Sequence, residues 1–160
     1  MGREKREAEK AVEREIRMEK MQFEMESHSR NEQFARVVVA VFLARLDPTV
    51  EELDDVKTAV SEAVTNCIIH GYEGGAGTIR VEVMLEEQNA TIHVIDWGVG
   101  IADVKRAMEP MYTTRPGEDR SGMGFAFMEA FMDEVTVKSV PGEGTVVTMK
   151  KMIGREGRKA

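Results

Sequence analysis

Two helical segments in direct succession, separated only by Asp47-Pro48-Thr49, constrain the fold of this chain most. The first runs from Ser29 or Asn31, either of which suits a helix cap, to about Leu46. The second starts at the proline turn and ends at Gly71, since glycine commonly stops helices. The apolar stripes expected to face the core are Phe34, Val37, Val38, Val41, Phe42 and Leu46, then Val56, Val60, Val64 and Ile68.

Short segments with strand character flank this helical pair. Met21–Glu26 alternates apolar and polar residues before it, and Thr78–Glu86 and Thr91–Asp96 follow it, joined around Glu87–Asn89. The remaining expected elements are helices near Asp103–Met108 and Phe125–Met132 and a hairpin of Val135–Val140 with Thr145–Met152. The pattern predicts a two-layer α/β sandwich, with the helices on one face of a mixed sheet.

Composition favours one soluble domain. The 160 residues are 42% hydrophobic and 32% charged, which is typical of a globular protein with a charged surface. The net charge of -7 disfavours direct binding to nucleic acid, which needs a basic face. No apolar run approaches the roughly 20 residues that span a bilayer. The single cysteine, Cys67, lies in an apolar helical stretch, which indicates a reduced thiol and a cytoplasmic protein.

The first twenty residues differ from the rest, because thirteen of them are Arg, Lys or Glu. Ala8, Ala11, Val12 and Ile16 form only a thin apolar stripe. Residues 1–20 are therefore interpreted as a partly helical or disordered extension, with a short coiled-coil contact as the alternative. Translation from Met18 or Met21 is a further alternative. The folded domain is expected at residues 21–153 and a flexible tail at 154–160.

Glu62, Asn66 and His70 follow one another at intervals of four residues on the second helix. This spacing keeps them on one side of an α-helix, opposite the core side. An asparagine carbonyl oxygen suits Mg²⁺, and a carboxylate one turn away is placed to take a proton from an attacking hydroxyl. The plain alternative is the polar face of an amphipathic helix.

Two glycine motifs follow. Asp96 ends an apolar strand and is followed by Gly98 and Gly100. A carboxylate at a strand end can accept a hydrogen bond from the amino group of adenine. The two glycines would let a ligand approach the backbone. Gly122-Met123-Gly124 opens a helix whose backbone amides suit phosphate oxygens. Either motif alone is also typical of an ordinary turn or loop.

In this order, the three motifs resemble the N-box (Glu62–His70), G1 box (Asp96–Gly100) and G2 box (Gly122–Gly124) of the GHKL ATPase superfamily, which has the Bergerat fold. Within it, the chain closely resembles the anti-sigma F factors, serine protein kinases that control a sporulation sigma factor. The resemblance covers roughly residues 21–153. It is carried by residues 59–66, 70–72, 112–116, 120–125 and 131–135.

The resemblance implies a role for each matching residue. Glu62 would be the catalytic base, Asn66 the Mg²⁺ ligand, and Arg120 the cation that meets the γ-phosphate. Asp96 would recognise adenine. The other nucleotide contacts would be Gly98, Gly100, Thr114, Ser121, Gly122, Met123, Gly124 and Thr145. Glu32 and Arg36 match a segment that meets protein partners, although their spacing also suits a surface ion pair.

The implied function is that of a dimeric anti-sigma factor and ATP-dependent serine kinase. It would hold a sigma factor of the sigma F type and phosphorylate a serine of a small anti-anti-sigma protein, with ATP/ADP and Mg²⁺ as cofactors. Two alternatives stay open: a switch kinase for a general-stress sigma factor, and a non-catalytic binding module ordered by ATP. A sensor histidine kinase is disfavoured, since neither His28 nor His93 lies on a long dimerisation helix.

Overall fold

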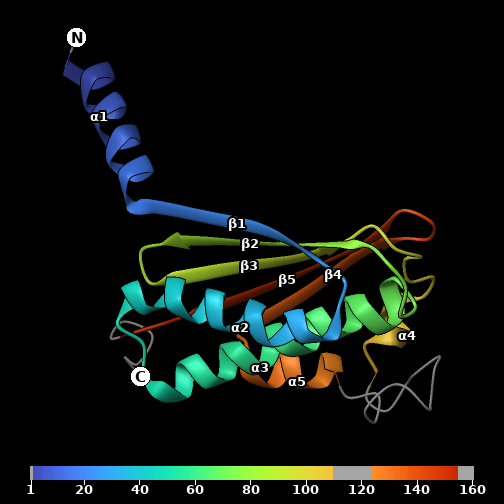
Figure 1. Ribbon diagram of the computed structural model, residues 1–160. Coiled ribbons are helices and arrows are strands. Elements are labelled where there is room, and N and C mark those ends of the chain that lie inside the picture. Colours follow the sequence, from blue (N-terminus) through green and yellow to red (C-terminus); the bar gives the residue numbers. More distant parts are fainter. Residues whose placement is uncertain (1, 110–123, 155–160) are drawn as a thin grey trace.

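A computed structural model describes residues 2–109 and 124–154, apart from the side chains at 14–17. The helices are α1 (Gly2–Arg17), α2 (Ser29–Leu43), α3 (Val50–Asn66), α4 (Val104–Ala107) and α5 (Gly124–Phe131), with a 3-10 turn η1 (Ala44–Leu46) and a π-helical turn η2 (Cys67–Gly71). The strands are β1 (Met18–Glu26), β2 (Thr78–Glu86), β3 (Asn89–Asp96), β4 (Glu134–Val140) and β5 (Gly144–Met152). Helices α2, α3 and α5 cover one face of the sheet, and α1 projects beyond its end (Figure 1).

The predicted two-layer α/β sandwich is confirmed, but the prediction of a mixed sheet is wrong. The strand order is β1-β2-β3-β5-β4, and every neighbouring pair is antiparallel. Two helices, not one, separate β1 from β2, so the chain crosses the sheet twice and returns to the end where β1 finished. Thr78 of β2 accordingly pairs with Glu26 of β1. A single crossover helix would have given parallel strands.

The core lies between the helices and the sheet, and the apolar stripe predicted for the first helical segment is only partly right. Phe42 and Leu46 are buried as predicted, whereas Phe34, Val37 and Val41 are 62%, 52% and 68% exposed. The other buried residues of α2 are Ala35, Val39 and Leu43. The helix has apolar residues on both sides, so periodicity alone could not select the inner one. In α3 the predicted Val56, Val60 and Val64 are fully buried.

The ends of the two long helices also differ in how well they were predicted. α2 is capped by His28, whose Nδ1 accepts from the Arg30 N–H at 3.3 Å, and not by Ser29 or Asn31. Asn31 instead donates its side-chain amide to the Glu26 carbonyl at 2.8 Å. α3 begins at the predicted proline turn with a reciprocal capping box between Thr49 and Glu52.

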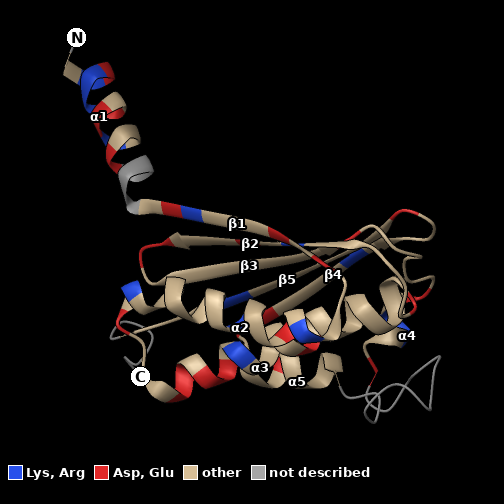
Figure 2. Ribbon diagram, viewed as in Figure 1, with Lys and Arg blue, Asp and Glu red and all other residues tan. Residues whose placement is uncertain are grey.

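Charges are unevenly spread along these elements. Both signs alternate on α1, and acidic residues gather on the first turns of α3 (Figure 2). In the described part of the chain, no helix is both long enough and apolar enough to cross a membrane.

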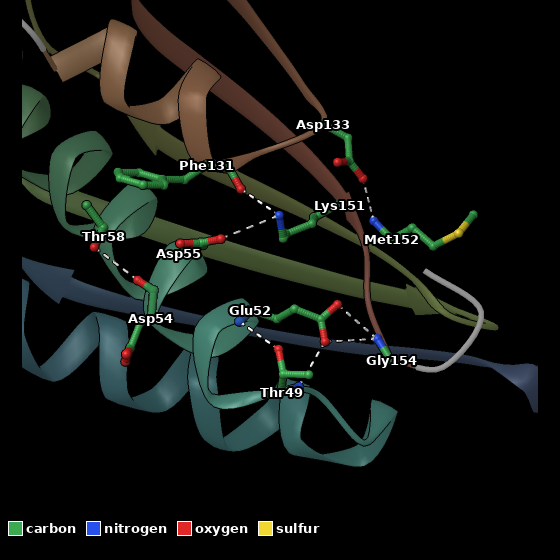
Figure 3. Close-up of polar contacts among 10 residues, drawn as sticks. All are labelled: Thr49, Glu52, Asp54, Asp55, Thr58, Phe131, Asp133, Lys151, Met152 and Gly154. Carbon is green, nitrogen blue, oxygen red and sulfur yellow. Dashed lines mark hydrogen bonds and ion pairs between the residues drawn. The ribbon is translucent and has the colours of Figure 1, made fainter. Parts of the chain in front are cut away.

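Glu52 also fastens the end of β5 to the start of α3. Besides its bond to the Thr49 N–H at 2.8 Å, its carboxylate accepts from the Gly154 N–H at 3.2 and 3.4 Å (Figure 3).

Glu52→Ala removes both connections, and we expect it to lower the free energy of unfolding by about 2 kcal/mol. The measurement is urea denaturation. Glu51→Ala is the control, because it removes an exposed first-turn carboxylate with the same helix-dipole effect; an equal loss in both variants would contradict the double role of Glu52.

Candidate nucleotide-binding site

The last turns of α3 and the start of α5 bring three of the predicted site residues together. Glu62 and Asn66 are half-buried and lie one turn apart on α3. A Cβ atom built at Gly124, the first residue of α5, would lie 3.2 Å from Asn66 Oδ1 and 3.4 Å from Glu62 Oε2. A carboxylate and an amide oxygen therefore face a helix N-terminus whose first residue leaves room beside them.

The helix does not continue in the same form to His70. Its predicted position assumed an α-helix through residue 70, but the helix widens to a π-helical turn at Cys67. The Tyr72 N–H bonds the Cys67 carbonyl at 2.9 Å to close the wider turn. A π-helical turn contains more residues than an α-helical turn. The four-residue spacing that aligns Glu62 with Asn66 therefore does not extend to His70.

Asp96 sits at the end of β3 and is only 5% exposed. Its Oδ1 accepts from the Gly98 N–H at 2.9 Å. Burial raises the pKa of Asp96 above its ordinary value, and the hydrogen bond from Gly98 partly offsets the rise. A buried carboxylate oriented by a backbone N–H is a fixed acceptor and keeps lone pairs for a further donor.

Close backbone approaches shape the space around Asp96. A Cβ at Gly98 would lie 1.9 Å from the Gly71 carbonyl oxygen, and one at Gly71 would lie 2.8 Å from Asp96 Cγ. Gly100 has φ +75°, and its Cβ would lie 2.4 Å from the Val140 carbonyl oxygen. The predicted glycines Gly98 and Gly100 are thus required by packing, because a side chain would collide with the Gly71 backbone at one position and with the Val140 backbone at the other.

Thr145 lies directly across the sheet from Asp96, in the β3–β5 register, and is 9% exposed. Ser139 Oγ lies 2.8 Å from Thr145 Oγ1 and donates to the Gly144 carbonyl at 3.0 Å. Since Ser139 has one proton, Thr145 donates to Ser139 and keeps its own lone pairs for a further donor. Thr145 is therefore oriented beside the Asp96 carboxylate.

Five predicted residues lie outside the described part of the chain: Thr114, Arg120, Ser121, Gly122 and Met123. Conversely, two residues at the site escaped prediction. Gly71 was interpreted as a helix stop, and the sequence around Ser139 offered no signal. Only the position of Gly71, directly after the N-box, pointed to a contact with Asp96.

The predicted partner residues lie on α2. The Ser61 hydroxyl of α3 hydrogen-bonds the Glu32 carboxylate. Within the described residues Arg36, which is half-buried, forms no ion pair with Glu32 or with another carboxylate. The surface ion pair proposed as an alternative is therefore absent from this part of the structure, and the guanidinium remains available to a ligand or partner.

Among the described residues, no group of three or more His, Cys, Asp or Glu side chains is placed to hold a metal. This does not conflict with Mg²⁺ bound through Asn66, since Mg²⁺ usually takes one or two protein ligands and completes its shell with water and phosphate.

Comparison with known proteins is consistent with a nucleotide site. The histidine kinase-like ATPase domain family matches residues 25–151. An anti-sigma F factor of Thermoanaerobacter sp. (strain X514) is 56% identical over 136 residues, covering 85% of this chain and 95% of the relative. One from Pasteuria penetrans is 54% identical over 140 residues, covering 86% and 93%.

A crystal structure of the RsbU and RsbW domains of a Mycobacterium tuberculosis protein has the same fold. The TM-score is 0.61 at 22% sequence identity, and the match covers 86% of this chain and 32% of that longer chain.

Proposed function

Because this chain belongs to the anti-sigma F factor family and contains a histidine kinase-like ATPase domain, we propose that it is an ATP-dependent serine kinase that also sequesters a sigma factor. The observation that carries the proposal is the buried Asp96 carboxylate, joined through η2 to the Glu62–Asn66–Gly124 cluster. The Asp96 carboxylate suits an adenine base, and the Glu62–Asn66–Gly124 cluster suits phosphates and a reacting hydroxyl.

An adenine nucleotide fits the described residues on two counts. The fixed carboxylate of Asp96 accepts a hydrogen bond from an exocyclic amino group, and the tight backbone at Gly98 and Gly100 leaves a face without side chains at these positions. In this proposal Gly98, Gly100 and Thr145 line the base, and Gly124 belongs with Thr114, Ser121, Gly122 and Met123 on the phosphate side.

Catalysis is assigned to Glu62. Its carboxylate accepts the proton of the substrate serine hydroxyl, and Asn66, one turn away on α3, would hold Mg²⁺ through its amide oxygen. When bound, Mg²⁺-ATP supplies the phosphoryl group and neutralises its negative charge. Arg120 is proposed to stabilise the charge that develops on the γ-phosphate, since a planar guanidinium suits phosphate oxygens.

The protein partners follow from the family. We propose that the chain binds a sigma factor of the sigma F type during sporulation, and phosphorylates a small anti-anti-sigma protein on serine to inactivate it. Both activities belong to the cytoplasm. Glu32 and Arg36 on α2 are the proposed contacts, because both are only half-buried and match the family segment that meets protein partners.

A homodimer is supported by the outer stripe of α2, formed by Phe34, Val37 and Val41. These exposed side chains lie opposite the core-facing side, and a helix apolar on both sides is normally buried. The adjacent β1 is an edge strand, paired on one side only along its nine residues. A second copy covering both would remove the exposed stripe and edge. Light scattering that shows only monomer at every concentration would contradict the dimer.

The adenine assignment is tested by Asp96→Asn. The amide presents a donor as well as an acceptor and loses the charge, so ATP affinity should fall about tenfold, or about 1.4 kcal/mol. Calorimetric titration of wild type and variant measures the change, with a melting curve to show that both are folded. Unchanged affinity would remove Asp96 from the nucleotide site.

A further inference from the structure

Lys151 of β5 points toward the helices, on the same face of the strand as the buried Val147 and Met149. Its side chain is only 14% exposed. The Nζ atom donates a hydrogen bond to the Phe131 carbonyl at 2.7 Å and lies 3.9 Å from Asp55 Oδ2 (Figure 3). Phe131 is the last residue of α5, and Asp55 belongs to α3. One ammonium group therefore joins β5, α3 and the C-terminal end of α5.

The end of α5 is a favourable place for a cation. The last carbonyls of an α-helix have no partner within the helix and form the negative end of its dipole. Neighbouring hydrogen bonds hold the chain just beyond Phe131 to the same strand. The Asp133 N–H donates to the Lys150 carbonyl at 2.9 Å, and the Met152 N–H donates to Asp133 Oδ2 at 2.7 Å. The C-terminal end of α5 is thus fastened to β5.

The opposite end of α5 lies at the proposed phosphate side of the nucleotide site. Seven residues separate Gly124 from Phe131, and seven separate Asp55 from Glu62, so each interval rises about 10 Å along its helix. Gly124 faces Glu62 and Asn66, while the other end of α5 is held beside Asp55. The two helices therefore run antiparallel over matching lengths. A displacement of the eight-residue α5 at its C-terminal end would also move Gly124 relative to α3.

We infer that Lys151 is a positioning residue, which places the N-terminus of α5 for the nucleotide phosphates by holding this helix at its other end. The inference rests on the proposed nucleotide site. Asp96, the proposed adenine acceptor, lies on β3 and is bonded within its own loop, so its position does not depend on α5. Loss of the ammonium group should therefore weaken the binding of phosphates and spare the binding of adenosine.

The test compares the affinities of ATP and adenosine in variants of Lys151. Lys151→Met keeps a long side chain but removes the donor and the charge. ATP affinity should fall about fivefold, the size expected for one hydrogen bond, while adenosine affinity stays within about twofold of wild type. Lys151→Arg keeps a cationic donor and should restore most of the lost ATP affinity. Competition with a fluorescent ATP analogue measures both ligands, and a melting curve shows that each variant is folded.

Lys150→Met is the matched control, because Lys150 is exposed and alternation places its side chain on the other face of β5. It should leave the ratio of ATP to adenosine affinity unchanged. An unchanged ratio in Lys151→Met, including an equal loss for both ligands, would show that Lys151 only stabilises the fold and would overturn the inference.

Two further outcomes are also decisive. If Lys151→Met does not fold, Asp55→Asn removes the charge opposite the ammonium group instead, and it should lower the ratio about threefold. A wild-type ratio in Asp55→Asn would then overturn the inference. If the wild-type chain itself binds ATP no more tightly than adenosine, the proposed phosphate side of the site fails first, and the inference fails with it.

Discussion

Glu62→Gln should leave Mg²⁺-ATP binding close to wild type and reduce phosphate transfer to a substrate serine by about 10²-fold or more. The glutamine side chain has the same shape, so the space beside Asn66 and Gly124 is preserved. What the variant loses is the proton acceptor, and a positioned base commonly contributes a rate factor of about 10² to 10⁴. Loss in the rate of transfer without loss in affinity identifies an interaction needed in the transition state.

The measurement is transfer of radiolabelled phosphate from ATP to a purified anti-anti-sigma protein, with ATP affinity determined separately. Glu51→Gln is a suitable control, because it removes an exposed carboxylate of the same helix far from Asn66. Transfer at the wild-type rate in Glu62→Gln would exclude the base role. No transfer by the wild-type chain, despite tight ATP binding, would instead favour a non-catalytic module that uses nucleotide for order alone.

The sequence was most informative where one local rule decides the outcome. The proline turn started α3 where expected, the alternating segment Met21–Glu26 became part of β1, and residues 78–86 and 91–96 formed strands with the predicted antiparallel pairing. Glu62 and Asn66 could be paired in advance because four residues of α-helix fix their relative positions. Such features depend on neighbours in the chain, so a single sequence contains the information.

Prediction failed for features that are determined by residues far apart in the sequence. The inner side of α2 depends on what α3 and the sheet leave uncovered, and its apolar residues on both sides give no preference. The close approach of Gly71 to Asp96 depends on the π-helical turn, which no local sequence pattern predicted. Ser139 reaches Thr145 only through the hairpin of β4 and β5. The fold and the proximity of Glu62 and Asn66 were therefore accessible from sequence, while the residues packed around Asp96 were not.

Arg36→Ala should weaken binding of the sigma factor or the anti-anti-sigma protein about 30-fold, equivalent to about 2 kcal/mol, and leave ATP binding intact. Truncation of a central interface arginine commonly has an effect of this size. The structure sharpens the expectation, because within the described residues the guanidinium forms no ion pair with Glu32, whose carboxylate is bonded by Ser61. Within the described residues Arg36 therefore forms no ion pair that stabilises α2, and its truncation should lower partner affinity more than the stability of the fold.

Arg30→Ala is the matched control. It removes the same charge from the exposed first turn of α2, so a general electrostatic attraction between α2 and an acidic partner would be weakened by both variants alike. Surface-plasmon affinity of the ATP-loaded variants for each partner separates the two cases, and a melting curve for each variant shows whether the fold is kept. A selective loss in Arg36→Ala assigns the half-buried middle of α2 to partner recognition. Equal affinity of wild type and both variants for both partners would mean that Arg36 is only a solvated helix residue, and the recognition surface would then have to lie on another element of the chain.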